Sequence, residues 1–115
     1  MAALTVRTDS AKGAVVVRLG GDVDAQSAPA LAKALAAASA EPGTLLVVDL
    51  AGVNYVGSAG WGTFLGSVRA ADAQGKQLVL AGLSRELRKV FEMLHFQTVL
   101  RTAPDVETAV RLVGG

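Results

Sequence analysis

Hydrophobic positions follow two different spacings along this chain. Short apolar or alternating runs, rich in β-branched side chains, predict five strands, at 4–8, 14–19, 44–50, 77–81 and 98–101. Segments in which apolar residues recur every three or four positions predict four helices, over about 27–41, 59–72, 84–94 and 105–113. The predicted order of elements is therefore ββαβαβαβα.

This order predicts both the fold and the place of a site. Strand–helix alternation favours parallel strands joined by right-handed crossovers, and a turn at 11–13 makes the first two strands an antiparallel hairpin. We expect one α/β domain over 1–115, with a mixed, mostly parallel sheet packed with helices. Because one helix links the second and third strands, their carboxyl ends share one edge of the sheet. Residues 21–24 should therefore lie near 57–60, where such sheets bind ligands.

Composition narrows the classes of function. The 115 residues are 51% hydrophobic, and 11 basic residues against 10 acidic ones give a net charge of +1. This balance gives no electrostatic reason to expect nucleic acid or an anionic membrane as partner. No segment resembles a membrane span or a signal peptide, so we expect a cytoplasmic protein without membrane insertion. With no cysteine and a single histidine, His95, disulfides are excluded and a metal site is not expected.

The most informative segment is 47–62, which predicts a buried strand, a short turn, a glycine-rich corner and the first turn of a helix. The corner consists of Gly57, Ser58, Ala59 and Gly60. Such a corner presents backbone N–H groups and one hydroxyl at the carboxyl edge of the sheet. Ser58 is a candidate N-cap for a helix beginning near Ala59, and this is the preferred interpretation. It is also a candidate phosphate acceptor.

The neighbours of the corner each allow two interpretations. We assign Gly62 and Gly66 to close packing of the helix on the sheet, and Gly57 and Gly60 to a flat surface that a partner can approach. Trp61, the only tryptophan, is interpreted as a core residue, with an interface anchor as the alternative.

Two carboxylates, Asp22 and Asp24, follow the second strand, before the candidate N-cap Ser27. They are either turn and capping residues or partner-binding groups.

Catalysis is not indicated by these residues. A serine at a strand-to-helix turn is typical of a hydrolase nucleophile elbow, but that pattern requires Gly-x-Ser-x-Gly, and Val56 occupies the first glycine position. Nucleotide or anion binding is a distant alternative. The corner lacks the lysine of a phosphate loop and reverses the glycine spacing of the dinucleotide fingerprint. We therefore expect a binding module rather than an enzyme, with no cofactor.

Together these features resemble the STAS family, the anti-sigma factor antagonists of bacteria. The resemblance is carried by Leu19–Asp24 with Ser27, by Val47–Leu50, by the corner, by Ser84–Phe96 and by Val106–Val110. It implies a module that docks on a GHKL-fold serine kinase acting as an anti-sigma factor, and so regulates transcription. It also implies that phosphorylation of a corner serine or threonine breaks this contact. The residues expected to bind the partner are Asp22, Asp24, Gly57, Ser58, Ala59, Gly60 and Trp61.

The chain departs from the family pattern at three positions. Family members usually read Asp-Ser-Ser-Gly or Asp-Ser-Thr-Gly at the corner, so Gly57 removes the acidic residue. We align the usual acceptor with Ala59, which has no hydroxyl. Constitutive binding without a phosphate switch is the favoured consequence, and phosphorylation of Ser58 is the alternative. His95 stands where many members have glycine. A further alternative is a STAS domain that serves as a scaffold, sensory or lipid-transport accessory subunit.

Overall fold

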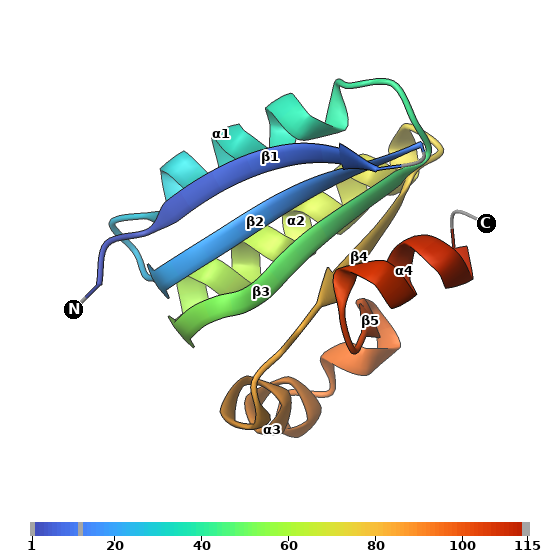
Figure 1. The fold of residues 1–115 in the computed structure, drawn as a ribbon. Coiled ribbons are helices and arrows are strands. Elements are labelled where there is room, and N and C mark those ends of the chain that lie inside the picture. The colour runs from blue at the N-terminus through green and yellow to red at the C-terminus, as the bar shows by residue number, and fades with distance from the viewer. Residues whose placement is uncertain (1, 12, 114–115) are drawn as a thin grey trace.

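The computed structural model describes residues 2–11 and 13–113, which form one five-stranded sheet with helices on both faces (Figure 1). The strands are β1 (Thr5–Ala11), β2 (Ala14–Val23), β3 (Leu45–Val56), β4 (Gln77–Ala81) and β5 (Arg101–Ala103). The helices are α1 (Ala28–Ser39), α2 (Ser58–Ala73), α3 (Arg85–Met93) and α4 (Val106–Val113), with a 3-10 turn, η1 (Phe96–Thr98). In the sheet the strands follow their chain order; β1 is antiparallel to β2, and the other neighbours are parallel. The predicted order of elements and the mixed sheet are confirmed.

The two central strands run further than the sequence predicts. β2 continues to Val23, and β3 continues through 51–56, where the sequence predicts a turn. Their pairing shifts register around Gly20 and Gly21, and such irregularities interrupt the alternation by which a strand is recognised. A Cβ on Gly52 would lie only 3.0 Å from a backbone oxygen of β2, so the absence of a side chain there keeps the strands close.

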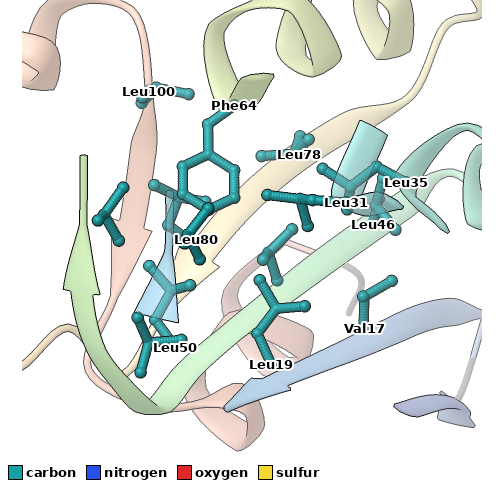
Figure 2. Packing of buried hydrophobic residues seen from close by; sticks show 14 of the residues in the cluster. Val17, Leu19, Leu31, Leu35, Leu46, Leu50, Phe64, Leu78, Leu80 and Leu100 are labelled. Carbon is teal, nitrogen blue, oxygen red and sulfur yellow. The ribbon is translucent and has the colours of Figure 1, made fainter. Parts of the chain in front are cut away.

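The core has a layer on each face of the sheet. On one face, alternate residues of β2, β3 and β4 pack against α1, α2 and α3; Figure 2 shows Leu46, Leu50 and Phe64 among them. On the other face, Val47 and its neighbours pack against α4 through Ala109. Burial of each large apolar side chain contributes about 1.5–3 kcal/mol, so these contacts stabilise the sheet that carries the site.

The predicted apolar stripe of α3 is only half buried. Leu87 and Phe91 lie in the core, but Val90 and Leu94 are exposed, Leu94 by 50%. The helix ends at Met93, and the chain turns away at His95, which has a left-handed φ of 58°. The exposed side of the last turn therefore carries apolar side chains.

The sequence predicts the last strand at 98–101; the strand is present, but its predicted bounds are wrong. Residues 96–98 form the turn η1, closed by hydrogen bonds of 3.0 and 2.8 Å from the amides of Val99 and Leu100 to the carbonyl of Phe96. The strand therefore begins only at Arg101. The β-branched pair Thr98-Val99 favours a strand by propensity, but the backbone hydrogen bonds of the turn override it.

Candidate functional site

The carboxyl ends of β2 and β3 lie side by side at the start of α2. Val23 pairs with Val56 in the last rung, and the amide of Gly57 donates a 2.8 Å hydrogen bond to the carbonyl of Val23. From β2 the chain turns through Asp24 into α1, and from β3 it enters α2 at Ser58. The structure thus brings together the two segments that the topology predicts to converge.

Ser58 is the first residue of α2 and not its N-cap. Gly57 occupies the cap position, with extended backbone angles, and no side chain of residues 2–11 or 13–113 caps the helix. The predicted capping role of Ser58 is therefore wrong. Its side chain is exposed, and no hydrogen bond to its hydroxyl is found within the part of the chain that the structure describes. The hydroxyl is directed to solvent at the start of a helix.

The first turn of α2 is electrostatically suited to negative charge. The amide of Trp61 is bonded to the carbonyl of Gly57, so the amides before it have no acceptor within the helix. No acidic residue lies in this turn. The positive end of the helix dipole is therefore not compensated from within the helix. Ala59, the next residue, is half-buried.

The glycines of α2 have the reverse of their predicted roles. Gly60 is buried, and a Cβ built on it would lie 2.7 Å from Cγ1 of Val23 and 2.8 Å from Cγ1 of Val56. Gly62 and Gly66 are exposed, with nothing within 4 Å of an added Cβ. Gly60 therefore permits close packing of α2 on the strand ends, and the assignment of Gly62 and Gly66 to packing is wrong.

Trp61 is a core residue, with only 3% of its surface exposed. Its ring packs edge-on against Phe64 at a centroid distance of 5.9 Å, and against Phe91 and Phe96 at 6.1 and 5.3 Å. Its Nε1 is buried without a hydrogen-bond partner among the described residues. The preferred interpretation as core holds, and the alternative of a surface anchor is wrong for this conformation.

Asp22 fixes the N-terminal segment rather than facing a partner. Its side chain is 9% exposed; its Oδ2 accepts a 3.1 Å hydrogen bond from the amide of Ala2, and its own amide donates to the carbonyl of Ala2. The adjacent Gly21 has a φ of 86°, and a Cβ there would overlap the carbonyl oxygen of Ala3. A direct partner contact by the Asp22 carboxylate does not fit this burial.

Asp24 organises the turn into α1. Its Oδ1 accepts hydrogen bonds from the amides of Ser27 and Gln26, at 2.9 and 3.1 Å, and from the Ser27 hydroxyl at 3.0 Å. The amide of Asp24 in turn donates to the Ser27 hydroxyl at 2.9 Å. The hydrogen bonds that the carboxylate accepts, the one from the Ser27 amide above all, lower the pKa of the Asp24 carboxyl below its ordinary value. Ser27 stands at the N-cap position as predicted, but its hydroxyl bonds to Asp24 instead of capping the helix.

Tyr55 belongs to the corner, although it is not among the residues predicted to bind a partner. The residue lies in β3, opposite Asp22, and its side chain is 52% exposed. A Cβ built on Gly57 would lie 2.9 Å from the Tyr55 hydroxyl oxygen and 3.3 Å from Cε2. The signal available in the sequence is a lone tyrosine two positions before the corner glycine. Interpreting 51–56 as a turn concealed that Tyr55 lies at the end of the strand that leads into Gly57.

Two absences apply to the described ranges, 2–11 and 13–113. No group of three or more His, Cys, Asp and Glu side chains is placed to hold a metal ion there. Nor is any helix in those ranges long and apolar enough to cross a bilayer.

Comparison with known proteins identifies the family. The STAS domain family model matches residues 5–109, and the chain belongs to this family. The anti-sigma-B factor antagonist of Listeria monocytogenes is 33% identical to it over 82 residues, which make up 71% of this chain and 72% of the relative. The family resemblance predicted from the sequence is confirmed.

Solved structures share the fold. An anti-sigma factor antagonist from Mycobacterium paratuberculosis matches with a TM-score of 0.84 and 22% identity, covering 98% of this chain and 96% of that chain. The phosphorylated form of the Bacillus cell fate determinant SpoIIAA matches with a TM-score of 0.70 and 22% identity, covering 94% and 99%. At these identities the likeness concerns the fold, and it agrees with the α/β architecture described above.

Proposed function

We propose that this domain is an anti-sigma factor antagonist, which binds a serine kinase-type anti-sigma factor of the GHKL fold and so regulates sigma-factor-dependent transcription in the cytoplasm. The printed name of the Listeria relative, an anti-sigma-B factor antagonist, supports this function. The observation that carries the proposal is the exposed Ser58 hydroxyl at the uncapped start of α2. A kinase can approach it without unfolding any of the structure described.

The proposed contact surface is smaller than the set of seven residues predicted from the sequence. It consists of Asp24, Gly57, Ser58 and Ala59, which are exposed or half-buried. Asp22, Gly60 and Trp61 lie beneath it and hold it in place. On this proposal the domain acts by binding, and the reaction on Ser58 belongs to the partner.

We further assign the phosphate to Ser58, the second of the two alternatives left by the sequence. Position 59 is half-buried and carries only a methyl group, whereas the Ser58 side chain is exposed. A phosphate on Ser58 would sit at the positive end of α2, where negative charge is tolerated by the folded domain. The added charge of about −1.5 to −2 would have to be desolvated in a tight interface, which opposes docking. The switch would therefore act on the complex and not on the fold.

The test is affinity capture of the tagged domain from a lysate of the source cells, with intact-mass analysis of the captured bait. We expect a GHKL-fold serine kinase in the eluate of the wild-type domain and its loss with Ser58→Glu. Ser10→Glu is the matched control, because Ser10 is an exposed serine of β1 that pairs with Val15 at the amino end of β2.

Each outcome of this capture bears on the proposal. A kinase retained by wild type and Ser10→Glu but lost by Ser58→Glu supports it. A phosphate-sized mass gain mapped to Ser58 supports the phosphate switch. Recovery of transporter or scaffold subunits without a kinase would contradict the anti-sigma function and leave the STAS fold intact.

A further inference from the structure

The chain exposes one aromatic side chain, and it lies at the corner. All five aromatic residues are within the described ranges. Trp61, Phe64 and Phe91 are buried in the core, and Phe96 is half-buried against them. Tyr55 is 52% exposed. The aromatic residue that the sequence suggested as a surface anchor, Trp61, is thus unavailable in this fold, and Tyr55 is the one that is presented.

The position of Tyr55 ties it to the phosphorylation corner. Gly57 has no side chain, and the tyrosine ring occupies the space beside its Cα, with the hydroxyl oxygen 2.9 Å and Cζ 3.4 Å from where a Cβ would stand. Ser58 follows immediately along the chain. On the neighbouring strand β2, Asp22 pairs with Tyr55 and is itself bonded to Ala2, so the strand beside the tyrosine is held in place by the N-terminal segment.

We infer that Tyr55 is the aromatic anchor by which the kinase-type anti-sigma factor recognises this corner, an inference that rests on the proposed function. Tyrosine combines a large apolar ring with a hydrogen-bonding hydroxyl and loses little side-chain entropy when it is fixed, so it is enriched among residues that dominate binding energy. With no side chain at Gly57, a partner can enclose the ring and reach the Ser58 hydroxyl in the same contact. Tyr55 then determines which partner docks, and Ser58 determines when.

Two measurements on the purified proteins test this inference. The serine kinase-type anti-sigma factors of the source organism are titrated one at a time with wild type, Tyr55→Ala and Val99→Ala. Val99 is a matched control because it is 53% exposed but precedes β5, at the opposite end of the parallel strands from the corner. We expect Tyr55→Ala to weaken binding at least about tenfold and Val99→Ala to leave it unchanged. An unchanged far-UV spectrum and unfolding midpoint establish that both variants fold.

The second measurement uses the fact that the chain has a single tyrosine. Tetranitromethane nitrates exposed tyrosine rings, so the intact mass of this chain reports on Tyr55 alone. We expect rapid nitration of the isolated domain and strong protection in the kinase complex. A complex that forms with undiminished affinity after Tyr55→Ala, or in which Tyr55 is nitrated at its free rate, overturns the inference while the proposed function stands. If no kinase binds the wild-type domain, both are overturned.

Discussion

Gly57 donates its amide hydrogen to the carbonyl of Val23 across 2.8 Å, and this bond joins the end of β2 to the entry of α2. Directly behind it, Gly60 approaches Val23 and Val56 too closely for a methyl group to fit. Gly57, Ser58 and Ala59 are therefore accessible to a partner, and the residues beneath them are tightly packed. Substitutions of the packed residues, such as Gly60, should change the stability of the fold. Substitutions of the accessible residues should change the affinity for the partner.

The glycines of α2 provide the sharpest test of this packing. Gly60→Ala should lower the free energy of unfolding by about 1–3 kcal/mol, because the new methyl group overlaps two valine side chains of limited freedom. Gly62→Ala and Gly66→Ala should each raise it by up to about 1 kcal/mol, because both sites are open and alanine favours the helix. Urea unfolding of the three variants measures all of these changes. A gain in stability with Gly60→Ala would refute the close contact.

Trp61 should behave as a structural residue. Trp61→Ala should cost about 3–5 kcal/mol, a large share of the stability of a small domain, because it opens a cavity among three phenylalanines. Tyr55→Ala, at an exposed position, should change stability by no more than about 0.5 kcal/mol. The intrinsic fluorescence of Trp61 should also resist quenching by iodide. Easy quenching in the folded protein would place the indole at the surface instead.

The stabilisation that the turn into α1 gives the folded state should depend on pH. The pKa of Asp24 lies below its ordinary value of 3.8, so its ionised carboxylate stabilises the folded state at neutral pH. This contribution to stability should persist as the pH falls to the ordinary pKa of an aspartate. It should disappear as the pH falls further, through the lowered pKa of Asp24 in the folded state. The difference in unfolding free energy between wild type and Asp24→Ala should therefore shrink in that acidic window.

A second carboxylate serves as an internal comparison for that profile. Asp105 accepts a 2.7 Å hydrogen bond from the amide of Thr108, which likewise lowers its pKa. Asp105→Ala should give the same direction of change in the same window. A difference between wild type and either variant that stays constant, or grows, as the solution is acidified would contradict the assignment.

His95 is a non-glycine residue whose backbone adopts the left-handed conformation, with a φ of 58°. Glycine adopts this conformation without the steric cost, so His95→Gly should raise the free energy of unfolding by about 0.5–1 kcal/mol. His95→Ala retains the Cβ and should give no comparable gain. Thermal unfolding of the two variants side by side distinguishes them. A loss of stability with glycine would indicate that the imidazole makes a contact that outweighs the strain.

The sequence predicted the order of the elements and the convergence of β2 with β3, because both follow from apolar spacing and from the geometry of parallel strands. It did not predict the length of those strands. The irregular pairing near Gly20 and Gly21 breaks the alternation that a strand pattern requires. Tyr55 was missed for the same reason. A residue that is assigned to a turn cannot be placed on either face of the sheet.

Which glycines of α2 face the sheet was also beyond the sequence. Successive helical residues differ in direction by about 100°, so Gly60 and Gly62 lie about 160° apart around the helix and cannot both face the sheet. Gly62 and Gly66 were placed against the sheet because glycines within a helix suggest close packing, but a glycine has no apolar side chain that shows which face it occupies. The structure starts the helix at Ser58 and places Gly60 against the sheet. The contacts of Gly60 with the two valines show which glycine faces the sheet.

The most direct measurement is the calorimetric titration of the purified serine kinase-type anti-sigma factor with wild type, Ser58→Glu and the control Ser10→Glu. The proposed function predicts equal affinity for wild type and Ser10→Glu and a loss of at least about a hundredfold with Ser58→Glu, because a charge is placed where the partner must exclude water. Equal affinity for all three proteins would contradict it and place the interface away from the corner.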